Sequence, residues 1–299
     1  MVIDIHSHLA YAPIYPGRYL VDMFTDMDEK QKMKLEKLIA VLLKDKDGSY
    51  FLKQMDKAQV EKAVLLIIDG GIGLGEADMS IEEIYEVHYR VLKQWPDRYI
   101  IFGGIDPRRG EKGFDLFRKG VEHFGFRGLK LYPPMGYSMD HDGLLPIYDY
   151  CDQNRLPVLL HTGPSQAGLL NELADPLLIR PVAEKFKNIN FILAHAGFNL
   201  TNDVIDLVES FDNIFLDLAG FRARYKSVNE EMINNFKPLF LGKLNTRVLF
   251  GNDWPLFNLI TPVVKNVEML QELGDIIAGK NSSALKNILF NNAQAVLNN

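Results

Sequence analysis

Eight short apolar runs recur along this 299-residue chain, and stretches with helical periodicity lie between them. Apolar runs without alternating polar residues are typical of strands buried on both faces, as in a parallel sheet covered by helices. Eight such units of strand and helix can close into a (β/α)8 barrel, which we predict; an open doubly wound sheet is the alternative. The runs cover residues 2–8, 62–69, 99–105, 126–132, 157–162, 190–195, 214–219 and 247–252.

The composition is that of a globular protein, with 47% hydrophobic residues spread evenly along the chain. No apolar run approaches the roughly 20 residues that a membrane span requires, so we predict one domain over residues 1–299 and no membrane partner. The first run begins at Val2, which leaves no room for a secretory leader, and we expect a cytoplasmic protein. A net charge of −6 without a basic stripe argues against a nucleic-acid partner.

The clearest helical periodicity covers residues 80–94, where Ser80 followed by Glu83 predicts a capping box. His88 lies within this helix and is expected to be a packed or solvent-facing side chain rather than a ligand. The single cysteine, Cys151, excludes a disulfide framework and a thiolate-rich zinc site. We expect it to be a small buried side chain at the end of a helix.

The interval between the first two runs is longer than one loop. Residues 28–46 have the pattern of a charged helix, so we predict a helical insertion over roughly residues 19–46. This insertion could cover the open end of the barrel as a lid or join two subunits in a homodimer. The alternative is one more helix of the outer layer.

Polar residues with metal-binding side chains end several of the apolar runs. The reactive groups of such barrels come from the C-terminal ends of several strands. A strand projects residues i and i+2 side by side, so His6 and His8 could hold one ion together. Residues with these properties end five runs: His6 and His8 the first, Lys130 the fourth, His161 the fifth, His195 the sixth and Asp253 the eighth.

A single histidine on an apolar strand is more often a core residue than a ligand. Four histidines and an aspartate at equivalent ends of a repeating unit are poorly explained by independent core placement, and we predict a shared metal site. Neutral imidazoles with one carboxylate suit Zn²⁺, and Mn²⁺, Fe²⁺, Co²⁺ or Ni²⁺ also bind such mixed nitrogen and oxygen sites.

The order of these residues resembles that of the amidohydrolase superfamily over essentially the whole chain. The segments Gly-Leu-Lys-Leu-Tyr-Pro, Leu-Ala-His-Ala-Gly and Gly-Asn-Asp-Trp-Pro resemble one branch. That branch holds uncharacterised TIM-barrel metal-dependent hydrolases alongside the aminocarboxymuconate-semialdehyde and resorcylate decarboxylases. The resemblance implies a catalytic or substrate-polarising role for His195. It also implies the metal ligands His6, His8, His161 and Asp253.

Lys130 has two possible roles under this resemblance. In some superfamily members a carbamylated lysine after the fourth strand bridges two metals, and His161 with His195 would then hold the second ion. In the branch that this chain resembles one metal is usual, and the lysine would stay a cation that pairs with a carboxylate. We therefore predict one divalent ion, and we include Lys130, Tyr132 and Arg222 in the set of substrate-binding residues.

The predicted reaction is hydrolysis of an amide, ester or lactone in a small, anionic substrate. A bound divalent ion lowers the pKa of water to about 7, Asp253 accepts the proton and His195 stabilises the oxyanion. The alternatives are a metal-dependent, non-oxidative decarboxylase of a carboxylated aromatic or muconate-like substrate, and a metal-binding protein without turnover. The full ligand set together with His195 argues against the last alternative.

Loops near the predicted site add weaker features. The glycine-rich segment 70–75 fails the spacing of a dinucleotide-binding loop, and we expect a flexible loop at the mouth of the site. Arg222, Arg224 and Lys226 follow the seventh run and either bind an anionic substrate or form a solvated loop. Arg108 and Arg109, which follow the third run, have the same two interpretations.

Overall fold

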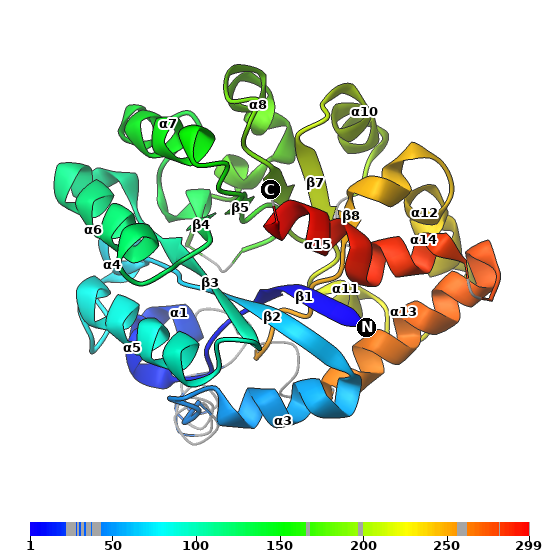
Figure 1. The fold of residues 1–299 in the computed structure, drawn as a ribbon, viewed down its shortest axis with the longest axis horizontal. Coiled ribbons are helices and arrows are strands. Elements are labelled where there is room, and N and C mark those ends of the chain that lie inside the picture. Colours follow the sequence, from blue (N-terminus) through cyan, green and yellow to red (C-terminus); the bar gives the residue numbers. More distant parts are fainter. Residues whose placement is uncertain are drawn as a thin grey trace.

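Eight parallel strands form one sheet whose order in space follows their order in the sequence (Figure 1). The computed structural model describes residues 1–21, 28, 30, 33, 37, 43–165, 168–196, 200–255, 262–280 and 282–298. The predicted (β/α)8 barrel is confirmed, and each predicted run contains or overlaps one strand. The strands are β1 (Val2–Ser7), β2 (Val60–Leu66), β3 (Tyr99–Gly104), β4 (Gly128–Leu131), β5 (Val158–Leu160), β6 (Phe191–Leu193), β7 (Ile214–Asp217) and β8 (Val248–Leu249).

The barrel closes between β1 and the segment that follows β8. The Ile5 amide donates to Phe250 O at 2.9 Å, and the His8 amide donates to Trp254 O at 2.7 Å. Gly251 permits this close approach, because a Cβ at that position would lie 2.9 Å from the Cβ of His6. The closure places the end of β1 directly beside Asp253.

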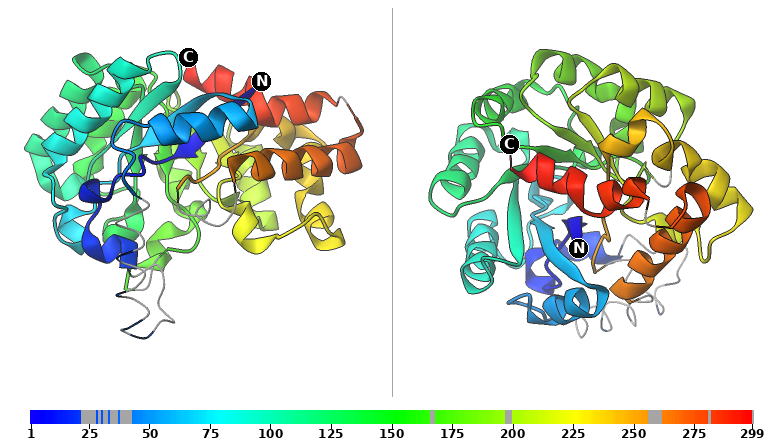
Figure 2. Two further views of the ribbon diagram at one scale, coloured as in Figure 1. Left: turned by 90° about the horizontal axis from the view of Figure 1, so that it is seen from below. Right: turned by 45° about the vertical axis from the view of Figure 1, so that its right-hand side comes forward.

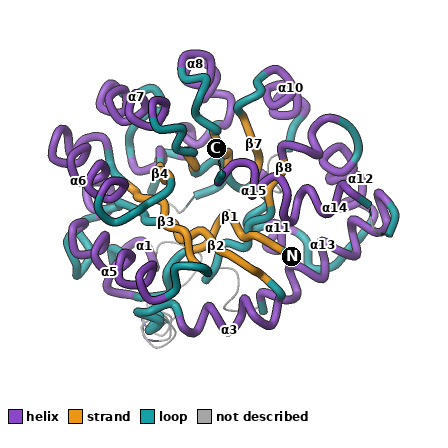
Figure 3. Tube along the Cα trace, in the orientation of Figure 1, coloured by secondary structure: helices purple, strands orange, loops and turns teal. Residues whose placement is uncertain are grey.

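Helices surround the strands on the outside of the barrel (Figure 3). The predicted helix at 80–94 is α5, whose capping box between Ser80 and Glu83 is present. His88 and Cys151 are both buried, as expected for packed side chains. The described helices are α1 (Gly17–Val21), α3 (Ser49–Ala58), α4 (Gly71–Leu74), α5 (Ile81–Gln94), α6 (Gly110–Glu122), α7 (Leu145–Gln153), α8 (Arg180–Lys185), α10 (Asn202–Ser210), α11 (Phe221–Arg224), α12 (Glu230–Phe240), α13 (Val263–Ala278), α14 (Ser283–Lys286) and α15 (Asn292–Leu297). Within the described parts of the chain, none of these helices combines the length and apolar composition that a membrane crossing requires.

The C-terminal helix α15 lies across the N-terminal end of the barrel (Figures 1 and 2). Its side chains join the strand residues that fill the barrel interior, among them Ile5, Phe102 and Leu249. The contribution of α15 to this inner core consists of Ala293, Val296 and Leu297. The C-terminal ends of the strands lie at the opposite end of the barrel, where α1 and α11 also lie (Figure 2).

The two ends of the long segment between β1 and α3 are tied together. The Ala12 amide donates to Leu43 O, the Asp45 amide donates to Ala10 O, and Tyr11 forms an isolated bridge with Lys44. The predicted charged helix at 28–46 does not reach residue 46, because residues 43–46 are not helical and Lys44 bridges Tyr11. Most of its other residues fall outside the described part of the chain, so its role as a lid or subunit contact stays a prediction. The paired ends of this segment, residues 10–12 and 43–45, therefore lie close to the end of β1 and to His8.

The glycine-rich segment after β2 differs from the expected flexible loop. Gly71–Leu74 forms one turn of helix, α4, which packs against the segment after β4. A Cβ at Gly73 would lie 2.9 Å from Met135 O, so the glycine allows the two loops to approach closely. Close packing against the segment after β4 therefore accounts for the glycine at position 73.

Candidate metal centre

His6, His8 and Asp253 converge at the C-terminal end of the barrel. The Nε2 atom of His6 lies 3.6 Å from Asp253 Oδ1, and the Nε2 atom of His8 lies 3.5 Å from the same oxygen. All three side chains are buried. Four ligands about 2.0–2.2 Å from a tetrahedral zinc ion stand roughly 3.3–3.6 Å apart, so the spacing fits one shared divalent ion.

The second nitrogen of each imidazole has its own acceptor. His6 Nδ1 donates to Asp217 Oδ2 at 2.8 Å, and His8 Nδ1 donates to Leu66 O at 2.9 Å. Because each Nδ1 donates its proton to an oxygen, Nε2 is the nitrogen of each ring that faces Asp253 and is left to bind an ion. Burial, followed by the charge of Lys130, lowers the pKa of His6 well below its usual value and keeps the ring neutral. These donors fit a transition-metal ion.

Asp253 and His195 share an uncommon backbone conformation. Their φ angles are +55° and +63°, in the left-handed region that side chains other than glycine rarely adopt. The Asp253 amide donates to His6 O at 2.7 Å, which helps to hold this conformation. Burial raises the pKa of Asp253, but the neighbouring His8 and His6 side chains outweigh burial and hold the pKa below its usual range. Strained backbone of this kind clusters at functional sites.

His195 and His161 contact each other beside this cluster. His195 Nε2 lies 3.1 Å from His161 Nδ1, His195 Nδ1 lies 3.2 Å from Ala219 O, and His161 Nε2 lies 3.3 Å from Pro164 O. Both carbonyls can only accept, so all three hydrogen bonds form together only when one of the two imidazoles carries a proton on each nitrogen. Among the described residues, two groups of possible ligand atoms lie within 4.8 Å of one another, His6–His8–Asp253 and His6–His195–Asp217, and neither includes His161. The role of His161 as a fourth ligand stays a prediction.

Lys130 projects into the same region. It is 2% exposed, and its Nζ atom has no hydrogen-bond partner among the described residues. Burial lowers its pKa to about 8, although the charges of Asp217 and Asp253 oppose the shift. A buried ammonium without a partner is unfavourable on its own, so this atom is suited to receive an anionic group from a ligand.

Tyrosine side chains form one wall near Lys130. The Tyr132 ring stacks on the His161 ring, with centroids 4.1 Å apart, and the Lys130 ammonium lies 5.9 Å from the Tyr132 centroid. Tyr19, which α1 supplies from the start of the insertion, packs edge-on against Tyr132 at 6.1 Å. Tyr15 stacks on Tyr19 at 5.7 Å. The insertion thus contributes aromatic surface beside the candidate site, which the sequence pattern did not indicate.

The arginines after β7 and β3 have protein partners. Arg222 binds Lys226 O and the Met269 sulfur, so part of its guanidinium faces α13, and its substrate role stays a prediction. Arg108 pairs with Asp106. Arg109 pairs with Asp69 and Glu76. The interpretation of the arginines at 108–109 as substrate ligands is therefore not supported, because ion pairs already engage their charges.

Two buried carboxylates at this end were missed in the sequence. Asp217 ends β7 and accepts from His6, as described above. Asp4 accepts from the His6 amide, the Ser7 hydroxyl and the Asn252 amide, and burial raises its pKa to about 7. The position of Asp217 at a strand end was a usable signal, because the other candidates occupy the same register.

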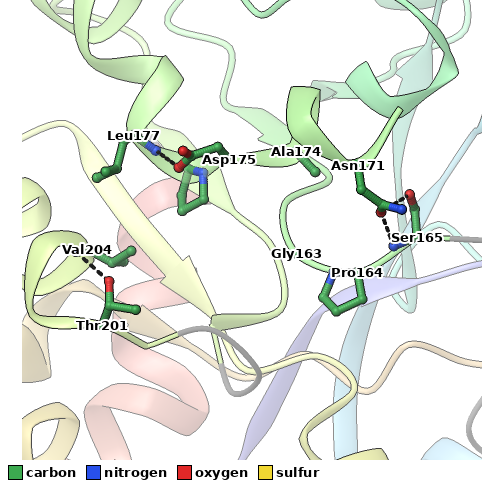
Figure 4. A pocket seen from close by; sticks show the side chains of 10 residues that line it. Gly163, Pro164, Ser165, Asn171, Ala174, Asp175, Leu177, Thr201 and Val204 are labelled. Carbon is green, nitrogen blue, oxygen red and sulfur yellow. Dashed lines mark hydrogen bonds between the residues drawn. The ribbon is translucent and has the colours of Figure 1, made fainter. Parts of the chain in front are cut away.

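A side cavity of about 500 Å³ lies next to the site, between the loop after β5 and the start of α10 (Figure 4). The polar side chains that line it already form local hydrogen bonds: Ser165 with Asn171, Asp175 with the Leu177 amide, and Thr201 with the Val204 amide. The lining does not include His6, His8 or Asp253. We therefore locate the chemistry at the histidine cluster rather than in this cavity.

Comparisons with known proteins agree with this architecture. A family model described as amidohydrolase matches residues 3–298. No curated protein matches the chain. An uncharacterised TIM-barrel protein from Bordetella bronchiseptica is similar in structure, with 20% identity, a TM-score of 0.69 and coverage of 99% of this chain and 98% of that chain.

Two decarboxylases are also similar in structure. The 2,6-dihydroxybenzoate decarboxylase from Rhizobium has 15% identity and a TM-score of 0.67, with coverage of 99% of this chain and 98% of that chain. The 5-carboxyvanillate decarboxylase from Novosphingobium aromaticivorans has 17% identity and a TM-score of 0.69, with coverage of 100% and 97%. Its structure holds manganese and a nitrobenzoic acid. At these identities the likeness establishes the fold.

Proposed function

Because this chain belongs to the amidohydrolase family, we propose that it is a metal-dependent enzyme that decarboxylates a carboxylated aromatic substrate without an oxidation step. The observation that carries this proposal is the buried Nζ of Lys130, which has no hydrogen-bond partner among the described residues and lies beside the Tyr132 ring and the His6–His8–Asp253 cluster. A cation and an aromatic face next to a metal centre match the carboxylate and the ring of such a substrate. The two decarboxylases with similar structures support this alternative over hydrolysis, which stays a prediction.

His6, His8 and Asp253 would hold the metal, and we propose His161 as a fourth ligand. When bound, a divalent ion would polarise the oxygen groups of the substrate as a Lewis acid. The donor set suits Zn²⁺ and also Mn²⁺, the ion in the similar carboxyvanillate decarboxylase. A cytoplasmic location, a homodimer and the absence of nucleic-acid and membrane partners remain predictions from the sequence.

Substrate binding and proton transfer are assigned to residues around the metal. Lys130 binds the substrate carboxylate, and Tyr132 packs against the ring. The bond between the ring carbon and the carboxylate breaks, its electron pair stays on the ring carbon, and CO₂ leaves. Asp253 first takes the proton of a neighbouring substrate hydroxyl and then delivers it to that carbon.

His195 is proposed to polarise the substrate during this step. Its Nδ1 is engaged by Ala219 O, so Nε2 is the nitrogen left to face the substrate, and it donates to a developing negative charge when it carries a proton. A bound substrate oxygen would compete with His161 for this hydrogen bond.

The test is an assay of the purified, metal-loaded protein against hydroxybenzoates with an ortho carboxylate, with CO₂ release measured. Lactones and amides form the second arm of the panel. We expect CO₂ from the first group, and we expect Lys130→Met to raise KM more than Lys130→Arg does. Turnover of lactones or amides without CO₂ release would overturn decarboxylation in favour of hydrolysis.

A further inference from the structure

We infer that Asp217 is a positioning residue that fixes both a metal ligand and the catalytic histidine of the proposed centre. Asp217 ends β7 and is fully buried. One carboxylate oxygen, Oδ2, accepts from His6 Nδ1 at 2.8 Å. The other, Oδ1, accepts from the His195 amide at 3.0 Å and the Ala219 amide at 2.9 Å. The inference rests on the proposed metal centre.

The contact with His6 determines which nitrogen of that ring is free. A carboxylate can only accept, so the proton of His6 must be on Nδ1. Nε2 then faces Asp253 and His8 without a proton, as a metal ligand must. Loss of this contact would free the ring both to rotate and to move its proton to Nε2, where the proton would block the ion.

The contacts with residues 195 and 219 hold the catalytic histidine. His195 has a φ of +63°, and its amide is bound by Asp217 while its ring Nδ1 donates to Ala219 O. Both the backbone and the side chain of His195 are therefore tied to the same short segment after β7. Asp217 links the ligand on β1 to the catalytic group after β6 through one carboxylate.

Asparagine at this position is a sharp test because its shape is the same and its chemistry differs. The site requires acceptors on both sides, and the asparagine amide offers one acceptor and one donor. If its NH₂ group faces His6, the His6 ring must accept there and carry its proton on Nε2. If the NH₂ group faces the amides of His195 and Ala219, donors oppose donors and His195 shifts.

Asp4 provides a matched control. It is also a fully buried carboxylate with three donors at the same end of the barrel, but it accepts from the His6 amide rather than from the ring. Asp4→Asn and Asp217→Asn should both lower the melting temperature. A general loss of packing would therefore weaken metal binding in both variants, whereas a change in the His6 ring would weaken it only in Asp217→Asn.

The experiment titrates metal-free wild type, Asp217→Asn and Asp4→Asn with Zn²⁺ and Co²⁺ and records the visible spectrum of the Co²⁺ forms. We expect Asp217→Asn to weaken metal affinity about 10- to 100-fold and to alter the Co²⁺ spectrum. We expect the metal affinity of Asp4→Asn to stay within about threefold of the wild-type affinity, when each protein is measured at a temperature where it is fully folded. Equal affinities and spectra for wild type and Asp217→Asn would overturn the role of Asp217.

A second measurement uses only the wild-type protein, so it tests the inference even if Asp217→Asn does not fold. Nitrogen NMR of histidine-labelled wild type, with His6 assigned through His6→Gln, should show the proton on Nδ1. A proton on Nε2 would overturn the inference. Wild-type protein that binds neither Zn²⁺ nor Co²⁺ would instead refute the proposed metal centre itself, which separates the two failures.

Discussion

The Nε2 atom of His195 lies 3.1 Å from the Nδ1 atom of His161, so the histidines that follow β6 and β5 share one hydrogen bond. His161 cannot offer Nδ1 to a metal while this bond persists. The two residues to which the family resemblance assigned different tasks are therefore coupled. A metal ion or substrate that binds one of these two histidines breaks their hydrogen bond and frees the facing nitrogen of the other.

His161→Ala and His195→Ala should separate ligation from catalysis. We expect His161→Ala to lose metal affinity by at least tenfold, because a four-ligand site would become a three-ligand site. His195→Ala should retain metal and lose turnover by about 100-fold or more, as expected for a removed polarising group. Inductively coupled plasma analysis and steady-state rates measure the two properties. If His195→Ala strips metal as thoroughly as His161→Ala does, His195 is itself a ligand.

Asp253→Asn should reduce turnover more than it reduces metal content. The asparagine amide still offers an oxygen toward the ion, but it cannot carry the proton that the reaction needs. We expect metal affinity to fall about tenfold and kcat to fall about a thousandfold or more. Asp253→Glu is the control that keeps the carboxylate but moves it. Residual kcat in Asp253→Asn within tenfold of wild type would remove Asp253 from the proton transfer.

The protein should bind close to one equivalent of divalent ion per chain, because the two groups of convergent donors among the described residues, His6–His8–Asp253 and His6–His195–Asp217, share His6, and Asp217 Oδ2 is already engaged by His6 Nδ1. Chelation should abolish activity, and adding the ion back should restore it. Elemental analysis of protein purified without chelator measures the stoichiometry. Two equivalents together with a carbamate on Lys130 would support the binuclear alternative and move His195 into the ligand set.

The barrel could be predicted from the sequence because each strand coincides with a short apolar run that is recognisable locally. Runs such as residues 99–105 are apolar throughout, and their repetition with helices admits few folds. The candidates His6, His8 and Asp253 followed from the rule that strand ends meet at one end of a barrel. Their convergence on one oxygen depends on the closure between β1 and the residues after β8, which no local pattern specifies.

Other features depend on tertiary contacts that the sequence does not encode locally. The arginines at 108–109 resembled an anion site, but their partner carboxylates include Asp69, about forty residues earlier in the chain. Tyr19 reaches Tyr132 only because the insertion folds back over the same end. Asp217 was visible at a strand end, yet a lone aspartate there has no recognisable spacing. These residues are found by geometry rather than by pattern.

Lys130→Met should stabilise the metal-free protein, and the gain should depend on pH. The pKa of Lys130 falls from 10.5 to about 8 because burial disfavours the charged ammonium. The cost of burying that charge is fully present below pH 8, declines as pH rises, and is absent above pH 10.5. A shift of this size corresponds to at most about 3 kcal/mol in the free energy of unfolding. Urea unfolding of wild type and Lys130→Met at pH 7 and pH 10.5 measures the difference.

The expected result is a stability gain for Lys130→Met at pH 7 that shrinks toward zero at pH 10.5, together with a higher KM for the substrate. Methionine has a similar length and fills the same space, so packing is conserved and the charge is the main change. A lysine that benefits the fold would give the opposite sign, with Lys130→Met less stable at pH 7. That outcome would show that the ammonium is satisfied within the protein, and it would remove the reason for assigning it to a substrate carboxylate.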